Sequence, residues 1–240
     1  MLAIITGTIK PNCAQNQVSL SNYEERFEQY VACIEFYLNS GAFSAIIFCE
    51  NSGYKIERFR ELEKKAKRNN IDLEILSFEG NQQKIEQQGK GYGEGEIMEY
   101  VFHNSKLIKE HNFFVKITGR LMIINIKKII KTIDIKNIYF NIPNKILRNI
   151  YDTRFYGMSV NNFQYYFSKK YIEVMDDRGI YLEHVYTDII KKYKLKIVNF
   201  PWYPRIKGVS GSSGVIYDYS EWKCKIKDIL CKFNYYTVRG

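Results

Sequence analysis

The chain has 240 residues, 45% of them hydrophobic, and a formal charge of +10 with a pI near 9.2. This size suits one substantial core, so we expect a single domain and no separate second one. The basic charge favours acidic partners such as phosphates, nucleic acid or an anionic membrane face, but the lysines and arginines are spread along the chain without forming one stripe.

The sequence also predicts where the protein resides. No run approaches the roughly 20 apolar residues that cross a bilayer, and residues 2–9 lack the basic flank of a secretion signal. The five cysteines are odd in number and form no Cys-x-x-Cys pair or Cys/His cluster, which indicates a reduced compartment. We therefore expect a soluble cytoplasmic protein, with contact at the inner face of a membrane as the alternative.

Apolar and amphipathic segments alternate through the first half of the chain. Strands are predicted at residues 2–7, 43–50, 72–78 and 113–118, and helices at 21–40, 55–70 and 94–109. Strands that alternate with helices over short loops favour a mostly parallel sheet covered on both faces. The expected fold class is α/β, with a mixed sheet flanked by helices.

After Arg120 the alternation becomes less regular. Strands are predicted at 137–142, 153–160 and 196–200, and helices at 161–177 and 181–193. The chain then ends in a basic amphipathic helix at 221–233. Its apolar side holds Trp222, Ile226, Ile229, Leu230 and Phe233, which we expect to pack against the domain; an anionic membrane is the alternative partner.

Polar residues follow the predicted strands, and ligands of open parallel sheets bind beyond the carboxyl ends of the strands. The first strand ends at Thr6 and Gly7, and the second is followed by Glu50, Asn51 and Ser52. Glu50 could accept hydrogen bonds from a ribose or a base edge, and the next two residues add short side chains that donate hydrogen bonds. An ordinary turn is the alternative explanation for this triplet.

A glycine-rich stretch at residues 89–95 precedes the third predicted helix. Its glycines permit close approach of a ligand, and free amides at a helix start favour anions, so Lys90, Gly91 and Glu94 are candidate binding residues. The spacing is not that of a Walker A loop, and a flexible turn with a helix cap is the alternative. On the fourth strand, alternation places Lys116 and Arg120 on one side, where Arg120 could neutralise a diphosphate; a surface salt bridge is the competing explanation.

The order of these parts resembles that of the GT-A nucleotide-sugar glycosyltransferases, especially the inverting enzymes that build bacterial polysaccharides. The resemblance covers roughly residues 2–215 and is carried by "IITGT", "IIFCENSG", "GKGYGEGEIMEYVFHNSKLI" and "FFVKITGR". The segments "TGTIKP", "KGYGEGE", "KITGRL" and "GVSGSSG" also resemble glycosyltransferase-like proteins of capsule or lipopolysaccharide gene clusters. The resemblance implies a GT-A-like, Rossmann-like single domain. Residues 1–120 would bind the nucleotide, residues 121–215 would bind the acceptor, and 216–240 would hold the terminal helix.

The chain departs from this family at the metal site. Thr118-Gly119-Arg120 stands where such enzymes carry an Asp-x-Asp-like motif. Fixed cations can stabilise a leaving diphosphate as a metal ion does, so we expect Arg120, assisted by Lys90 or Arg154, to act without a metal. Asp152 is a weaker alternative that could hold Mn²⁺ or Mg²⁺, and no other cofactor is expected.

The resemblance also implies the remaining roles. The nucleoside would contact Thr6 and Gly7, and Lys90 and Glu94 would contact the base edge or the donor sugar. Glu183 in "GIYLEHVYTDII" matches the acidic helix start that serves as the general base, and His184 is the rival base. The loop residues Ser210, Gly211 and Ser213 could close over the diphosphate.

These features predict an enzyme that transfers a sugar from a nucleotide-diphosphate donor, such as a UDP-sugar, to an oligosaccharide or lipid-linked glycan. Two alternatives stay open at this point. A sugar nucleotidyltransferase shares such an α/β half, but it would place its glycine-rich loop directly after the first strand. A nucleic-acid-binding module is disfavoured because no recognition motif is visible.

Overall fold

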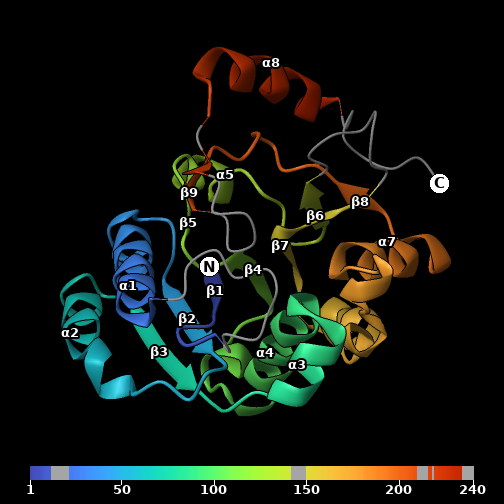
Figure 1. Cartoon of the computed structure of the whole chain (residues 1–240). Helices are drawn as coiled ribbons and strands as arrows, with labels where there is room; N and C mark the ends of the chain where they lie inside the picture. The colour runs from blue at the N-terminus through green and yellow to red at the C-terminus, as the bar shows by residue number, and fades with distance from the viewer. Residues whose placement is uncertain (12–21, 142–149, 210–215, 218, 234–240) are drawn as a thin grey trace.

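The computed structural model describes residues 1–11, 22–141, 150–209, 216–217 and 219–233 (Figure 1). Seven strands form one sheet in the order β3-β2-β1-β4-β7-β6-β8. They are β1 (Leu2–Gly7), β2 (Ala45–Glu50), β3 (Asp72–Ser77), β4 (Phe113–Thr118), β6 (Ile138–Asn141), β7 (Asp152–Ser159) and β8 (Ile197–Val198). Strands β1 to β4 are mutually parallel, and β7 is antiparallel to both β4 and β6. The predicted α/β class with a mixed sheet is confirmed.

Helices cover both faces of the sheet, as Figure 1 shows. The principal helices are α1 (Tyr23–Asn39), α2 (Arg60–Arg68), α3 (Gln82–Gln88), α4 (Lys90–Asn104), α5 (Ile126–Ile130), α7 (Leu182–Lys192) and α8 (Glu221–Lys232). Alternate strand residues point to opposite faces. Leu2 and Ile4 join a core under α4 and α7, whereas Ala3 and Ile5 join a core under α1, α2 and α5. The sheet therefore separates two apolar layers.

The first helix shows how local sequence sets an element. The side chain of Asn22 accepts hydrogen bonds from the backbone amides of Glu24 and Glu25, which caps α1 at its amino end. The acidic residues of this first turn also suit the positive end of the helix dipole. Phe27 and Ile34 are buried on the inner side, as their helical spacing predicts.

The helix predicted at 94–109 differs from the structure at both ends. Helix α4 begins at Lys90 and ends at Asn104, a separate α3 precedes it, and a short 3-10 helix, η2 (Leu107–Glu110), follows it. The glycines of residues 89–95 therefore lie mostly inside the helix and do not form a loop before it. A Cβ at Gly95 would collide with Tyr171. This glycine therefore allows α4 to pack closely against the segment that holds Tyr171.

The single helix predicted at 161–177 is also wrong. The segment contains α6 (Val160–Asn162), a π-helical turn, η3 (Phe163–Phe167), and two 3-10 turns, η4 (Lys170–Glu173) and η5 (Asp176–Arg178). Lys169 has a left-handed φ of 60°, which interrupts the helix before η4. Phe163 and Phe167 of η3 belong to the core beneath α4 and α7.

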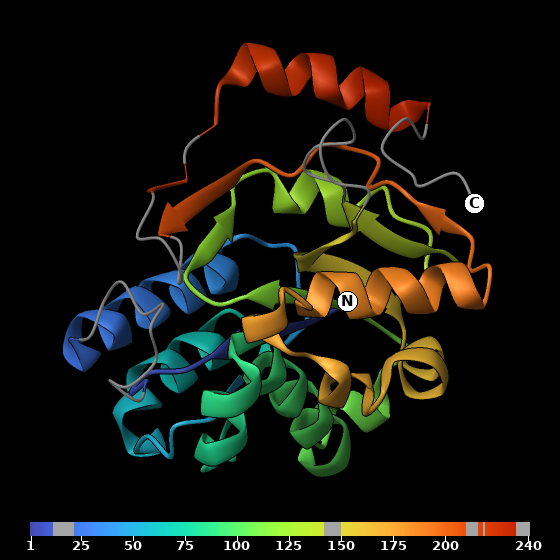
Figure 2. The same ribbon diagram turned by 45° about the vertical axis from the view of Figure 1, so that its right-hand side comes forward.

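A smaller sheet and a terminal helix complete the chain. The sheet consists of β5 (Leu121–Ile123), β9 (Ile206–Val209) and β10 (Ile216–Tyr217), paired antiparallel. Helix α8 lies across one end of the molecule, at the top of Figure 2. Within the described ranges, no helix is both long and apolar enough to cross a membrane.

The expected packing of α8 is wrong. Of the five residues on its predicted inner side, only Leu230 packs against the core, whereas Trp222, Ile226, Ile229 and Phe233 are 52–78% exposed. Arg205 instead holds the opposite side of the helix, through ion pairs of 3.0 Å with Glu221 and 2.9 Å with Asp228. These charged contacts decide which side of α8 faces the domain.

Candidate functional site

The end of β2 is organised by the buried carboxylate of Glu50. Its Oε2 accepts hydrogen bonds from the backbone and the hydroxyl of Ser52, and its Oε1 accepts the backbone amide of Tyr54 at 2.7 Å and the hydroxyl of Ser77. Glu50 is fully buried, so in this arrangement it shapes the turn after β2 and does not face a ligand. A ribose contact would have to come from the residues that this turn positions.

Thr8, Asn51 and Gly93 connect the ends of β1, β2 and α4. Thr8 Oγ1 donates to Asn51 Oδ1 at 2.6 Å, and Asn51 Nδ2 donates to the carbonyl oxygen of Gly93 at 3.4 Å. The carbonyl groups of Thr6 and Gly7 accept backbone amides from neighbouring strand ends. The predicted residues Thr6, Gly7 and Asn51 therefore lie together at the carboxyl edge of the parallel strands.

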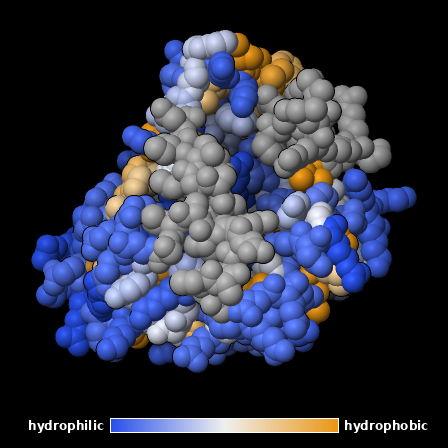
Figure 3. Space-filling view, viewed as in Figure 1, coloured by the Kyte–Doolittle hydropathy of each residue, from blue (hydrophilic) through white to orange (hydrophobic). Residues whose placement is uncertain are grey.

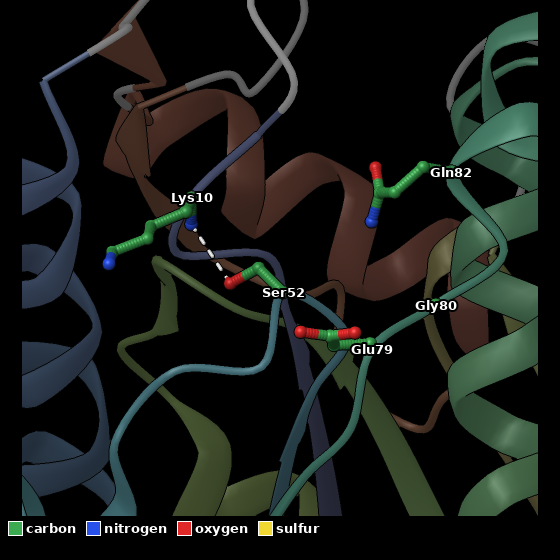
Figure 4. A pocket seen from close by; sticks show the side chains of 5 residues that line it. All are labelled: Lys10, Ser52, Glu79, Gly80 and Gln82. Carbon is green, nitrogen blue, oxygen red and sulfur yellow. Dashed lines mark hydrogen bonds between the residues drawn. The ribbon is translucent and has the colours of Figure 1, made fainter.

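A hollow of about 330 Å³ opens beside these strand ends. Its lining residues are Lys10, Ser52, Glu79, Gly80 and Gln82, and Figure 4 shows the side chains of Ser52 and Glu79 at its edge. The backbone amide of Lys10 donates to Ser52 Oγ at 3.0 Å. The hollow combines a cation, a carboxylate and an amide, which are groups that hydrogen-bond polar ring edges and hydroxyls.

Arg120 lies in the turn after β4 with a left-handed φ of 68°. The residue is only 6% exposed. Its Nη1 donates to the neutral side chain of Gln29 at 3.0 Å, and its guanidinium lies 5.7 Å from the ring centre of Tyr30. Among the described residues its Nε has no hydrogen-bond acceptor. A buried cation with an unused donor is costly unless an anion binds there.

Two further cations, Lys90 and Arg26, are influenced by the charge of Arg120. Burial lowers the pKa of Lys90 to about 8; the charges of Arg26 and Arg120 add to that effect, and the charge of Asp176 opposes it. Burial also lowers the pKa of Arg26, and the charge of Arg120 contributes in the same direction. These mutual effects place the three charges within electrostatic range of one another. We call Arg26, Lys90 and Arg120 the cation cluster.

The predicted pairing of Lys116 with Arg120 on one side of β4 is wrong. Lys116 contacts Glu94 on α4, whereas Arg120 contacts Gln29 on α1, which covers the other face of the sheet. Strand β4 ends at Thr118, and the left-handed backbone of Arg120 breaks the alternation that the prediction assumed.

The amino end of α4 is not an open anion site in this structure. The carboxylate of Asp176 accepts the backbone amide of Lys90 at 2.9 Å and is also hydrogen-bonded by the amide of Gly91. Burial raises the pKa of Asp176, and these two hydrogen bonds oppose the shift. The expectation that these helix amides bind the ligand is therefore corrected: an internal carboxylate occupies them.

A second polar group lies between α4, β4, β7 and α7. Lys116 is fully buried, and its Nζ donates to Glu94, to Thr118 Oγ1 at 2.7 Å and to the carbonyl oxygen of Thr153 at 2.9 Å. Thr153 Oγ1 in turn donates to Glu183 Oε1 at 2.9 Å. Residues from both predicted halves of the chain thus meet in one network.

The Glu183 carboxylate, predicted as the general base, lies in a largely buried environment. Burial raises its pKa, the charge of Glu94 adds to the shift, and the hydrogen bond from Thr153 opposes it. A carboxyl group shifted towards neutral pH transfers protons more effectively there. The rival, His184, uses Nδ1 to accept the backbone amide of Tyr181 at 3.1 Å and so caps α7.

The candidate metal ligand Asp152 is engaged by Arg154. Arg154 Nη2 donates to Asp152 Oδ2 at 2.6 Å, and Arg154 Nε donates to Oδ1 at 2.9 Å. No group of three or more His, Cys, Asp or Glu side chains suited to a metal ion occurs in the part of the chain described. The described residues do not fit a divalent ion at Asp152. The predicted loop residues Ser210, Gly211 and Ser213 lie outside the described ranges.

Arg26 was not identified from the sequence. It lies on the side of α1 that also carries Tyr30, Cys33 and Tyr37, and it is 5% exposed. Its Nε donates to the carbonyl oxygen of Thr8 at 3.0 Å. The sequence could have revealed it, because the helical spacing places this arginine on the apolar side of the helix. A charge on the buried side of a helix requires a partner.

No protein-family model matches the sequence, and no curated protein matches it significantly. Among solved structures, a nucleoside-diphosphate-sugar pyrophosphorylase from Vibrio cholerae has 12% identity and a TM-score of 0.48, covering 83% of this chain and 91% of that one. A candidate glucose-1-phosphate thymidylyltransferase from Bacillus anthracis has 12% identity and a TM-score of 0.46, covering 96% and 94%. Mouse xyloside xylosyltransferase 1 has 10% identity and a TM-score of 0.42, covering 100% and 94%. At these identities and TM-scores, neither a family nor a function follows.

Proposed function

We propose that this protein is a glycosyltransferase that moves a sugar from a nucleotide-diphosphate donor to a glycan acceptor. The observation that carries the proposal is the cation cluster, in which a nearly fully buried Arg120 keeps an unused Nε among the described residues. Positive charges brought together in a buried site raise each other's energy, and a diphosphate would relieve this repulsion. The guanidinium donors also match phosphate oxygens in geometry.

The donor would extend from the hollow to the cation cluster. The nucleoside would occupy the hollow beside Ser52 and Glu79, at the carboxyl ends of β2 and β3. The diphosphate would lie against Arg26, Lys90 and Arg120. Lys90 and Glu94 are four residues apart on α4, so they share one side of the helix. A sugar joined to the diphosphate would then reach Glu94 and the network around Lys116.

Glu183 would remove the proton from the attacking acceptor hydroxyl. As that oxygen bonds to the anomeric carbon, the bond from this carbon to the phosphate oxygen breaks, and the nucleoside diphosphate leaves with the bonding electrons. The cation cluster would stabilise the negative charge that develops on the departing diphosphate. A single displacement of this kind inverts the anomeric configuration. Lys116 would act as a positioning residue that holds Glu94 and the Thr153 backbone.

The proposal extends to the biological setting by the resemblance described above. The acceptor would be an oligosaccharide or lipid-linked glycan of bacterial surface polysaccharide synthesis, such as capsule or lipopolysaccharide. The enzyme would work in the cytoplasm, at the inner face of the membrane. A cation cluster in place of an Asp-x-Asp motif favours transfer that needs no divalent ion.

The direct test is a thermal-unfolding screen of the purified protein with UDP, GDP, CMP and dTDP and their sugars, each with EDTA and with Mn²⁺. A ligand at 100 times its Kd stabilises the folded state by about 2.7 kcal/mol, which corresponds to an increase in Tm of roughly 5–10 °C for a chain of this size. We expect one nucleoside diphosphate to stabilise the protein in EDTA. Stabilisation only with Mn²⁺ would keep the transferase and reject metal-free transfer.

Product analysis separates the proposal from a nucleotidyltransferase. A glycosyltransferase incubated with its donor and a glycan releases a nucleoside diphosphate and forms a new glycosidic bond. A nucleotidyltransferase incubated with a nucleoside triphosphate and a sugar 1-phosphate releases pyrophosphate. Pyrophosphate release without glycan extension would reject the proposed reaction. Salt-sensitive binding of nucleic acid, with no donor bound, would instead indicate the binding module.

A further inference from the structure

Helix α8 carries a stripe of large apolar side chains that faces solvent. Trp222 is 63% exposed, Ile226 52%, Ile229 57% and Phe233 78%. Their spacing of four, three and four residues places them on one side of the helix. Figure 3 shows hydrophobic residues gathered at the top of the molecule, over α8. We call these four side chains the α8 stripe.

The opposite side of α8 is the one that docks on the domain. Cys224, Asp228 and Cys231 are buried there. Asp228 pairs with Arg205 at 2.9 Å and accepts the backbone amide of Tyr203 at 2.8 Å. The helix is therefore anchored without any contribution from the stripe, and polar substitutions in the stripe should leave the fold intact.

Lysines border the stripe on both sides. At 100° per residue, Lys225 and Lys232 flank one edge and Lys223 flanks the other, whereas the ammonium of Lys227 donates to the hydroxyl of Tyr203 at 3.1 Å. The two acidic residues of the helix, Glu221 and Asp228, are both ion-paired with Arg205. The stripe is thus an apolar surface bordered by lysines on both sides, on a chain whose formal charge is +10.

The charge pattern selects the occupant. A second copy would dock by a symmetric interface and would bring the bordering lysines of the two copies close together, which is unfavourable. An anionic lipid surface offers hydrocarbon for the stripe and negative headgroups for the lysines that border it. Trp222 adds a side chain that favours the boundary between lipid and water.

We propose that α8 is a membrane-docking helix that lies flat on an anionic lipid surface, with Trp222, Ile226, Ile229 and Phe233 inserted between the lipid headgroups. This docking is independent of the proposed reaction and would hold if the enzyme used a different substrate.

The test is flotation of the full chain with two kinds of vesicle, phosphatidylcholine alone and phosphatidylcholine mixed with phosphatidylglycerol. The protein is expected to float only with the anionic vesicles and to be released by salt. The membrane partition coefficient of the I226S/I229S variant should be roughly thirtyfold lower than that of the unmodified protein, because each substitution removes apolar area from the bilayer interface. Each of K225Q and K232Q should lower it about fivefold.

The matched control is I135S/I172S, which replaces two isoleucines of similar exposure, 54% and 51%, that lie outside α8. It should float like the unmodified protein, and circular dichroism should show native folding for all variants. Failure of the unmodified protein to float with anionic vesicles would overturn the proposal, as would equal flotation of I226S/I229S. If the unmodified protein formed a dimer and did not bind vesicles, and the I226S/I229S variant were monomeric, the α8 stripe would be reassigned to contact with a second copy.

Discussion

Replacing Arg120 with Met should make the free protein more stable and the donor complex weaker. The variant removes a buried unsatisfied donor, worth about 1–3 kcal/mol, and loses one hydrogen bond to Gln29, worth about 0.5–1.5 kcal/mol. It also relieves repulsion with Arg26 and Lys90, while Met keeps much of the apolar stem and the same backbone strain. We therefore expect a net gain of about 1 kcal/mol, or roughly 2–4 °C in Tm.

Donor binding should change in the opposite direction. Loss of charge-assisted hydrogen bonds to a phosphate costs about 1.5–3 kcal/mol, so the Kd for the nucleoside diphosphate should increase about ten- to hundredfold. Differential scanning calorimetry measures the first effect, and isothermal titration calorimetry measures the second.

The control for this pair of measurements is Arg60→Met, which removes the same charge from an exposed position on α2. It should change neither Tm nor Kd. A destabilised Arg120→Met protein with unchanged Kd would refute the reasoning, because the guanidinium would then serve the fold and not a ligand.

Three further predictions concern the base, the cation cluster and the packing of α4. Glu183→Gln should lower kcat by about 10²- to 10⁴-fold. Because burial raises the pKa of Glu183, the activity of the unmodified enzyme should rise as the pH passes through that raised pKa, and the residual activity of the variant should lack this rise. Lys90 has a pKa of about 8 and would bind phosphate when protonated, so donor affinity should fall as the pH rises through about 8. The Lys90→Arg variant should retain its affinity at alkaline pH. If the affinities of both proteins changed with pH in the same way, Lys90 would be excluded as a ligand. Gly95→Ala should lower the free energy of unfolding by about 1–3 kcal/mol because the new Cβ meets Tyr171; a gain of up to about 1 kcal/mol, as expected in an open helix, would contradict this packing.

Part of the fold was predictable because the relevant forces act locally. The apolar runs of β1, β2 and β4 and the helical spacing of α1 specify their own secondary structure, and Asn22 caps α1 from within the same segment. Strands alternating with helices then favour a parallel arrangement. These elements lie where the sequence predicts them.

The boundaries of α4 could not be predicted in this way. Glycine is unfavourable inside an isolated helix, so residues 89–95 indicated a loop. The segment is helical because Gly95 packs against Tyr171 and Asp176 accepts the amide of Lys90. Both partners are distant in sequence, and no local pattern shows that they meet there.

The candidate site divides in the same manner. The sequence by itself indicated residue types at strand ends, including Arg120, because polar residues after buried strands stand out locally, and the family resemblance indicated Glu183 at a helix start. Only the tertiary structure joined Arg26 to Lys90 and Arg120, connected Glu183 to Lys116 through Thr153, and turned the apolar side of α8 outward. The physical reason is that secondary structure follows from short-range backbone and side-chain preferences, whereas burial and charge depend on which distant segments come into contact.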